Sequence, residues 1–544
     1  MTALTPHWNT FFLTLPLLAA LCYAVVACLP AGGSPEAANA LWRRAHAAAA
    51  AALAIALLAA GGWAAGAHGV LSIGSAVPLG SWGALGLSLR LDVLSVAMQV
   101  LVSFIGLVIL HYSRRQLDGD AGQRRYVRAY MATLAAVLLL VSTNNLLLLA
   151  LAWVAVSLAL HRLLTHFSDR PQALIAAHKK FIASRVADAC LLVAVGLIGS
   201  QVGSLEMDAL FTRVAAPGGL TPALQAAAVL AAIAAALKCA QLPFHGWLIQ
   251  VMEAPTAVSA LLHAGVVNMG GFLMIRLAPL MAPAASAQTL LVVIGTVTAV
   301  VAALVMSTRV SIKVMLAWST CAQMGFMLLE CGLGAYPLAL LHLLAHSLYK
   351  AHAFLSCGSV VEQWRTQAQA RKLAPVGFGV WLAALAVTPL AVGGAAWLLG
   401  VHATRDPALL ALAVVMSVAL TPLVARGLTS SGRQALGLFA LSVALSAVYF
   451  AWHGVFAQLL PTPAASADLW PRVVIVVAGF AALYLLHAAI AARPNGRWAQ
   501  ALQPHLFAGL YLDDLFTRAT FRLWPARLPQ AAPLRNTAYA STRA

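Results

Sequence analysis

Long apolar stretches separated by short polar segments recur along the chain. Each stretch is about 20 residues long, which is the length that an α-helix needs to cross the hydrocarbon layer of a membrane. Transmembrane β-strands are about half as long and alternate apolar with polar residues, which does not match this pattern. We therefore predict an all-α polytopic membrane protein with about fifteen transmembrane helices, at positions 9–29, 44–66, 88–112, 126–142, 144–165, 180–200, 222–242, 256–279, 288–307, 310–332, 336–361, 373–400, 408–427, 433–453 and 471–492.

The charges between these stretches predict how the chain is oriented. Lys and Arg gather in the cytoplasmic loops of membrane proteins. If the N-terminus lies outside, every predicted inner loop except the one between the seventh and eighth helices is basic, and the loop from Arg114 to Arg128 is the clearest case. The sequence thus predicts an N-terminus outside and a C-terminus in the cytoplasm. The outer segments 66–88 and 454–470, rich in Gly, Pro and Ala, are predicted to be short ordered loops.

Composition agrees with the membrane assignment and excludes other classes. Hydrophobic residues make up 62% of the 544 positions and charged residues 9%, whereas soluble domains have about 25% charged residues. The formal charge of +18 is mostly explained by the loop cations rather than by nucleic-acid binding. The seven cysteines show no CxxC or Cys/His zinc spacing, and no GxGxxG or P-loop is present, so we expect no cofactor or metal in this chain.

One central stretch, LKCAQLPFHGWLIQVMEAPTAVSALLHAGVVNMGGFLMIR from Leu237 to Arg276, places ionisable residues in an apolar background. It contains Lys238, Glu253 and His263. Ionisable groups inside a membrane are costly and are usually functional. Pro243 should break the helix because it has no backbone donor, and broken helices at membrane depth line polar cavities. The stretch therefore predicts part of an ion path.

A second polar cluster lies in the predicted eleventh helix, LLHLLAHSLYKAHAFLSCGS. His342, His346 and Lys350 are spaced i, i+4 and i+8, so they share one face of the helix. A single membrane histidine is often only a helix–helix contact. Three titratable groups in a row favour a proton relay, because histidine titrates near neutral pH.

Few acids fall within the predicted helices. Asp188 lies inside the sixth helix, one turn after Arg185, and a structural intrahelical pair and a relay role both remain open. Glu330 lies near the outer end of the tenth helix, and we interpret it as an acid at the water interface. The residues alone thus predict a path for protons or another small cation, without indicating what the ion flux is for.

The segment after the last predicted helix mixes Trp, Phe and Leu with Arg. From Trp498 it reads WAQALQPHLFAGLYLDDLFTRATFRLWPARL, a pattern that can form an amphipathic helix in the plane of the membrane interface. A solvated tail that touches lipid headgroups and a partner-docking element are equally compatible with it.

The central stretch also resembles a known family. ALKCAQLPFHGWLIQVMEAPTAVSALLHAG is similar to the hallmark of the proton-translocating antiporter-like family, which includes the large membrane subunits of respiratory complex I (NuoL and relatives) and of Mrp cation antiporters. STRVSIKVMLAWSTCAQMGFMLL, LLHLLAHSLYKAHAFLSCGSV and KKFIASRVADACLL resemble further family segments, and the resemblance covers about residues 85–365. It implies two inverted five-helix repeats, each with a broken helix. The proton-path residues that it implies are Lys238, His263, His342, His346, Lys350 and Lys313.

This plan divides the chain into five parts: N-terminal transmembrane helices at 1–125, a first repeat at 126–280, a second, degenerate repeat at 281–430, C-terminal transmembrane helices at 431–492 and a cytoplasmic amphipathic tail at 493–544. Two positions depart from the family pattern. Val154 stands where the family has a glutamate that would partner Lys238, so Asp188 becomes our candidate counter-charge. The segment PLAVGGAAW lacks the lysine of the second broken helix, so the second half-channel is expected to be incomplete.

Further segments, AWVAVSLALHRLL, AAHKKFIASRVADACLL and YLDDLFTRATFRLWP, resemble the DabB family. DabB is the membrane subunit of the DAB inorganic-carbon accumulation complex of bacteria. The resemblance implies a multi-pass protein of the inner (plasma) membrane that pairs, on the cytoplasmic face, with DabA, a large soluble zinc protein resembling a β-carbonic anhydrase. A cation flux through this chain, expected to be of protons, would drive hydration of CO2 to bicarbonate in DabA. This chain would then be a non-catalytic transport subunit.

Two other interpretations remain open. The chain could be a proton-translocating or cation/proton antiporter subunit of a respiratory or Mrp-type complex, or a membrane anchor without transport. The sequence also leaves open whether H+ or Na+ moves and whether two heterodimers pair.

Overall fold

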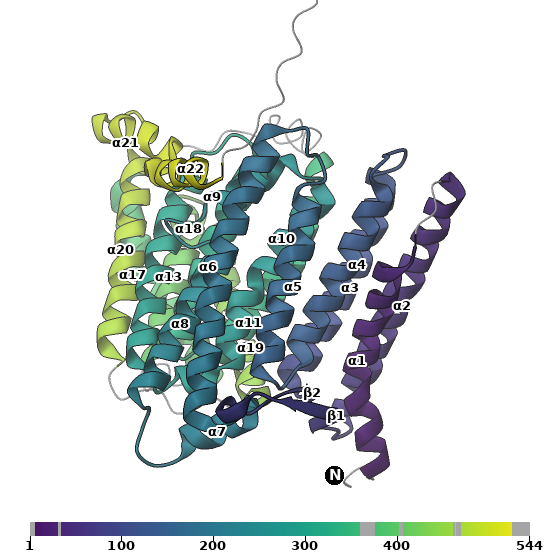
Figure 1. Cartoon of the computed structure of the whole chain (residues 1–544). Coiled ribbons are helices and arrows are strands. Elements are labelled where there is room, and N and C mark those ends of the chain that lie inside the picture. Colours follow the sequence, from purple (N-terminus) through teal and green to yellow (C-terminus); the bar gives the residue numbers. More distant parts are fainter. Residues whose placement is uncertain are drawn as a thin grey trace, which may run out of the picture.

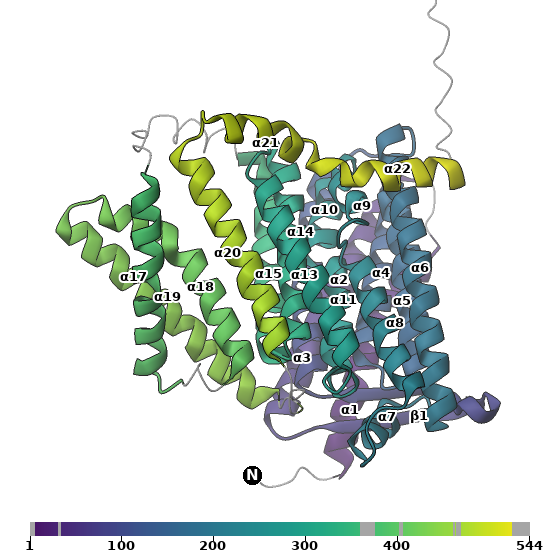
Figure 2. The same ribbon diagram turned by 90° about the vertical axis from the view of Figure 1, so that its left-hand side faces the viewer.

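The structure, a computed structural model, describes residues 6–30, 34–359, 376–401, 406–460, 463 and 469–524. Long helices run side by side in one bundle, with a β-hairpin at one end and two amphipathic helices across the other (Figures 1 and 2). We call these the hairpin end and the tail end. The helices up to the middle of the chain are α1 (Pro6–Cys28), α2 (Pro35–Ala64), α3 (Val93–Gln116), α4 (Gln123–Ser142), α5 (Leu146–Leu164), α6 (Pro171–Val202), α7 (Met207–Ala215), α8 (Pro222–Lys238), α9 (Gly246–Gln250), α10 (Thr256–Ala264) and α11 (Met269–Arg276). The later ones are α12 (Ala278–Met281), α13 (Ala285–Met306), α14 (Ile312–Gly332), α15 (Tyr336–Leu355), α17 (Phe378–Leu398), α18 (Pro407–Leu428), α19 (Gly432–Leu459), α20 (Trp470–Ala492), α21 (Arg497–Phe507) and α22 (Leu512–Leu523).

The apolar stretches form the helices that the sequence predicts. Within the described residues, thirteen helical segments are long and apolar enough to cross a membrane, and α10 with α11 counts as one of them. The shorter α8 and the more polar α15 run alongside these segments (Figures 1 and 2). The predicted all-α membrane fold is confirmed. One boundary differs in a way that matters for the site, because α6 begins at Pro171 rather than near residue 180.

The outer segment 66–88, predicted to be a short loop, forms a β-hairpin instead. β1 (Gly69–Pro78) and β2 (Ala84–Leu91) pair antiparallel, with an irregularity between Ile73 and Val77. The glycines and alanines that suggested a loop interrupt the alternation of apolar residues that would have indicated strands. The hairpin is tied to the bundle where the backbone N–H of Asn144 donates to the carbonyl of Ser88 at 2.8 Å.

The break predicted at Pro243 is present, whereas the second one is not. Helix α8 stops at Lys238 and α9 starts at Gly246, with Ala240 between them in a left-handed conformation at φ 51°. Helix α17, in contrast, continues through Pro389 without interruption. A proline removes only one helical donor, and the PLAVGGAAW segment has no charged side chain to bond the carbonyl groups that a break would free.

Small residues let the helices pack closely. A Cβ atom added to Gly325 on α14 would lie 2.7 Å from the carbonyl oxygen of Gly295 on α13, so these two helices meet backbone to backbone. Such contacts are typical of transmembrane helix interfaces. Across the tail end, α22 lies over α6 and α9 (Figures 1 and 2). The predicted tail beyond Trp524 lies outside the described residues.

Candidate ion-path site

A buried charge cluster sits where the broken helix stops. The ammonium nitrogen of Lys238 lies 3.1 Å from Oδ1 of Asp188, and the guanidinium of Arg185 lies 2.6 Å from Oδ2 of the same carboxylate. Lys238 and Asp188 have side chains that are only 10% and 5% exposed. The contact expected between Asp188 and Lys238 is therefore present, and the Arg185–Asp188 pair belongs to it rather than standing alone on α6.

An aromatic ring faces Lys238 next to the position where the family glutamate would stand. The Lys238 ammonium lies 4.9 Å from the centre of the Trp153 ring on α5, next to Val154. The face of an indole ring attracts a cation electrostatically. Asp188 and Trp153 together thus surround Lys238 without an acid on α5.

The sequence missed one lysine of this site. Lys180 stands at the very start of the predicted sixth helix, 180–200, but the early start of α6 places it inside the bundle at 3% exposure. Its ammonium donates to the carbonyl of Ser157 at 2.7 Å and to the hydroxyl of Ser157 at 2.9 Å. Lys180 and Asp188 are spaced i, i+8 on α6, the same spacing that indicated the cluster on α15. That signal could have identified Lys180.

The second predicted cluster is also buried. Lys350 donates to the carbonyl of Leu316 at 3.2 Å. His263 is fully buried and stacks on Phe354 of α15, with ring centres 4.4 Å apart. His346 is 4% exposed, and its ring nitrogens, like those of His263, have no hydrogen-bond partner in the described part of the chain. Buried polar groups without partners are rare in proteins, and titratable groups inside a membrane are usually functional.

Glu330 corrects one of our interpretations. It is 2% exposed rather than at the water interface, and its carboxylate lies 2.9 Å from Nδ1 of His342. The tertiary packing of α14 against α15 buries it, although its sequence position is near a helix end. Glu330 thus adds a carboxylate to the row formed by His342 and His346, whose rings lie 6.0 Å apart.

Two predicted residues lie apart from the buried groups. Lys313 donates to the hydroxyl of Thr256 at 3.0 Å near the tail end. Glu253 pairs with Arg170 at 3.4 Å, and its side chain is 43% exposed. The structure therefore brings Glu253 to the surface, because the break moves the chain out of the bundle before α10 begins.

The tail helix contacts the elements of the first cluster. The Asp513 carboxylate lies 2.8 Å from the ammonium of Lys179 and accepts a hydrogen bond from the amide of Gln250 on α9 at 2.9 Å. Trp524 stacks on His178 with ring centres 3.9 Å apart. The described part of the tail is thus docked on its own chain.

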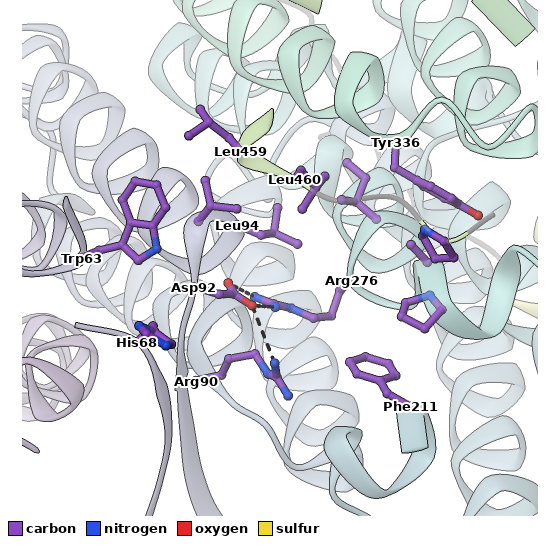
Figure 3. Close-up of a pocket in the computed structure, with 15 residues that line it drawn as sticks. Trp63, His68, Arg90, Asp92, Leu94, Phe211, Arg276, Tyr336, Leu459 and Leu460 are labelled. Carbon is purple, nitrogen blue, oxygen red and sulfur yellow. Dashed lines mark hydrogen bonds and ion pairs between the residues drawn. The ribbon is translucent and has the colours of Figure 1, made fainter. Parts of the chain in front are cut away.

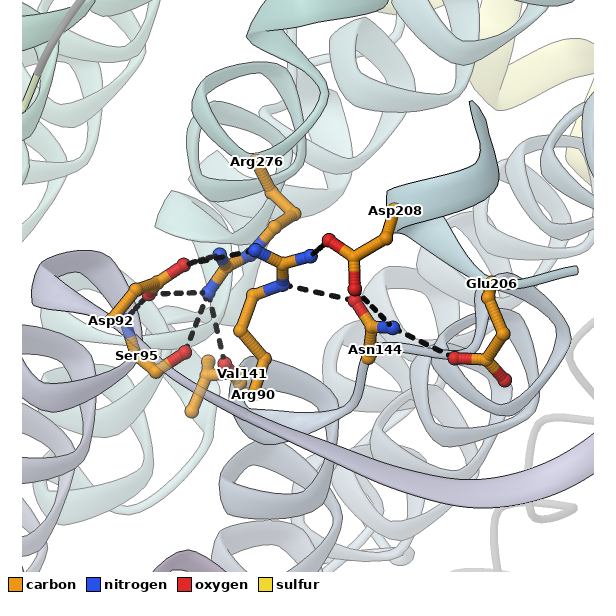
Figure 4. A network of polar contacts seen from close by, with 8 residues as sticks. All are labelled: Arg90, Asp92, Ser95, Val141, Asn144, Glu206, Asp208 and Arg276. Carbon is orange, nitrogen blue, oxygen red and sulfur yellow. Dashed lines mark hydrogen bonds and ion pairs between the residues drawn. The ribbon is translucent and has the colours of Figure 1, made fainter. Parts of the chain in front are cut away.

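A second polar network, not anticipated from sequence, occupies the hairpin end (Figure 4). Arg276 at the end of α11 is 5% exposed and pairs with Asp92, which caps the start of α3. Arg90 on β2 pairs with Asp208 on α7. Burial, the largest single influence, would raise the pKa of Asp92. The charge and hydrogen bond of Arg276, the Ser95 N–H and the charge of Arg90 together outweigh it and hold that pKa below its ordinary value.

This network borders a cavity of about 480 Å³ (Figure 3). Apolar side chains including Trp63, Phe211 and Leu460 form much of its wall. Arg90 and Arg276 are paired with carboxylates on other elements. These ion pairs join the hairpin to α7 and α11 to α3. Within the described residues, no group of three or more His, Cys, Asp or Glu side chains could hold a metal ion.

Comparison with known proteins shows which family this chain resembles. Residues 143–432 match the family described as "NADH:quinone oxidoreductase/Mrp antiporter, TM", and residues 80–127 match "NADH-Ubiquinone oxidoreductase (complex I), chain 5 N-terminus". A probable inorganic carbon transporter subunit DabB of Hydrogenovibrio crunogenus is 43% identical, over 80% of this chain and 83% of its own. The chain belongs to the DabB family, within the complex I and Mrp antiporter membrane subunits.

Other relatives extend the comparison. DabB2 of Halothiobacillus neapolitanus, a probable inorganic carbon transporter subunit, is 42% identical over 82% of this chain and 83% of its own. NADH-quinone oxidoreductase subunit L of Mycobacterium tuberculosis is 37% identical over 55% of this chain and 47% of its own. The structure of the Mrp complex from Dietzia sp. DQ12-45-1b matches with a TM-score of 0.55 and 25% identity, covering 96% of this chain and 58% of that one.

Proposed function

We propose that this chain is the cation-conducting subunit of an inorganic-carbon uptake complex and that the cation is the proton. The observation that carries the proposal is the buried Asp188–Lys238 pair at the broken helix, in a chain 43% identical to a DabB protein. In a water-poor site, a nearby carboxylate favours the protonated form of a lysine. If the carboxylate moves away, the lysine can release its proton. Arg185 contacts the other oxygen of the same carboxylate, so Asp188 has a second cation toward which it could move.

The remaining buried groups extend the path. Lys180 lies on the same helix as Asp188, and the second cluster offers His263, Lys350, His346 and the Glu330–His342 pair. Protons would pass between these groups through water. The second half-channel is incomplete, since α17 has neither a break nor a charge near Pro389.

The coupling is energetically sufficient. Moving one charge across 100 mV is worth about 2.3 kcal/mol, and each 1.4 kcal/mol is about tenfold in an equilibrium. One or two charges per turnover would therefore sustain a large bicarbonate gradient. The hydration of CO2 itself would occur in a zinc-containing, carbonic-anhydrase-like partner of the DabA type, on the cytoplasmic face at the tail end. The tail from Trp498 to Trp524 and, within the loop from Arg114 to Arg128, the segment from Arg114 to Gln123 are the proposed contact surfaces.

The test is bicarbonate accumulation in carbonic-anhydrase-deficient cells. The chain would be expressed alone, together with a large soluble zinc protein of the DabA type, and together with that protein in the presence of an uncoupler. We expect accumulation that needs both chains and collapses with the uncoupler. Arg433→Ala, an exposed cation at the start of α19, is the control that should leave it unchanged. Accumulation that persists with the uncoupler would contradict proton coupling.

A second candidate is a cation/proton antiporter subunit. The likeness to the Mrp complex over 96% of this chain favours it. It predicts cation/proton exchange in vesicles that contain this chain with sister membrane subunits, and no bicarbonate accumulation with a soluble zinc protein.

A further inference from the structure

Four arginines surround one cavity at the tail end, on α4 and α5. Arg124, Arg125 and Arg128 come from the start of α4, and Arg162 from the last turn of α5. The cavity has a volume of about 540 Å³. Its lining contains no carboxylate, so the four positive charges are not compensated there.

Two of these arginines are held in position by backbone carbonyl groups. Arg125 donates to the carbonyls of Thr165 and His166, at 3.0 and 2.8 Å. Arg128 donates through Nε to the carbonyl of Ala27 at the end of α1, at 2.9 Å. Their orientation is therefore fixed without neutralising their charge.

The other two arginines are available to a ligand. Arg124 and Arg162 have no ion pair or side-chain hydrogen bond among the described residues. Arg124 also lies in the first turn of α4, where the helix dipole disfavours a cation. No residue of that turn is acidic, and the nearby Asp120 carboxylate is already bonded to the N–H of Gly122 at 2.6 Å. An anion bound in the cavity would relieve both the mutual repulsion of the arginines and this unfavourable placement.

The rest of the lining is apolar and faces the membrane. It consists of Ala27, Ala129, Ala132, Ala155, Leu158 and Ala159. Leu158 is 45% exposed although it lies within a candidate transmembrane helix, so nothing in the described part of this chain covers that wall at membrane depth. The alanines leave a slot between α4 and α5 below the arginines.

We propose that this cavity binds an anionic phospholipid, with its phosphates on the arginines and an acyl chain in the alanine slot. One guanidinium group can donate two parallel hydrogen bonds to a phosphate. Basic pockets between transmembrane helices at the cytoplasmic side bind anionic lipid headgroups. Four cations favour a lipid with two phosphates over one with a single phosphate. A soluble protein could supply carboxylates but would not fill the membrane-facing slot.

The position of the cavity connects it to the ion-path site. At about 100° per residue, Leu158 and Arg162 lie roughly 100° to 180° around α5 from Trp153 and Ser157. The latter two contact Lys238 and Lys180. A lipid in the slot therefore packs against a different face of α5 from the one that contacts Lys238 and Lys180.

The test is lipid binding to the full-length chain by native mass spectrometry. Purified chain would be mixed with equal amounts of cardiolipin, phosphatidylglycerol and phosphatidylcholine. We expect cardiolipin to be retained preferentially, and its retention to fall about thirtyfold in Arg124→Gln/Arg162→Gln, from about 1 kcal/mol per lost cation. Arg433→Gln, an exposed cation at the same end, is the matched control and should retain it.

Three results would overturn the proposal. One is equal retention in the double variant and the wild-type chain, and another is equal retention of the three lipids by the wild type. The third is unchanged lipid binding with lost assembly of the soluble partner, which would assign the arginines to a protein interface. If the double variant does not fold, thermal stabilisation of the wild-type chain by cardiolipin over phosphatidylcholine decides instead.

Discussion

The ammonium group of Lys179 lies 2.8 Å from the carboxylate of Asp513, although 334 positions separate the two residues. Lys179 is fully buried on α6, and Asp513 lies on the tail helix α22. Gly246, the first residue of α9, leaves room for this carboxylate, because a Cβ atom there would collide with it. The ion pair therefore fastens the tail across the half-helix that follows the break.

Asp513→Asn should release the tail. Lys179 would lose its counter-charge in a buried position. We expect tail docking to be weakened by about 1–3 kcal/mol, less than for a fully buried pair because the Asp513 side chain is partly exposed. We expect trypsin to cut after Arg518 about tenfold faster in membranes that contain the full chain. Asp514→Asn, an exposed neighbour, is the control. Equal cleavage rates in the two variants would show that the ion pair does not hold the tail.

Asp188→Asn should abolish coupled bicarbonate accumulation while the complex still assembles. Lys238 would keep its aromatic contact with Trp153 but lose the carboxylate that it shares with Arg185. Accumulation and pull-down of the partner measure the two effects. Asp169→Asn, an exposed acid in another loop, should behave as the wild type. Full accumulation in Asp188→Asn would remove this pair from the path.

Glu330 and His342 should act as one unit. Because they are in direct contact, Glu330→Gln and His342→Gln should each lower coupled accumulation at least about tenfold, and the double variant should be hardly worse than either. The measurement is a double-mutant cycle on accumulation rates. Strictly multiplicative effects would mean that the two residues work independently.

The Asp92–Arg276 pair should stabilise the folded chain at neutral pH, and this stabilisation should be lost only in strong acid. The pKa of Asp92 is lowered by Arg276 in the folded chain, while an unfolded Asp titrates near 3.9. Its contribution is therefore complete above about pH 4 and is lost as the pH falls through the lower folded pKa. Melting temperatures of the detergent-solubilised chain from pH 7 to pH 3 test this. In Asp92→Asn the part of the acid dependence that this pair contributes should disappear, and a profile identical to that of the wild type would contradict the assignment.

Local patterns predicted much of the fold and about half of the candidate site. The row from His342 to Lys350 follows from helical spacing, and the break follows from the missing donor of Pro243. Glu330 and Lys180 could not be placed in this way. A residue near a predicted helix end is buried or exposed according to how far neighbouring helices extend beyond it, and α15 and the early start of α6 decide this for the two residues.

The sequence by itself determined the number and length of the apolar stretches, the broken helix and the faces on which the titratable residues lie, because these depend on composition and spacing within one helix. Apart from Asp188 with Lys238, which the sequence already suggested, only the tertiary structure decided which charges meet. Asp92 with Arg276 and Lys179 with Asp513 each join different elements. Such pairs form because helix packing removes both groups from water, so each charge must find a partner across an interface that no local pattern encodes.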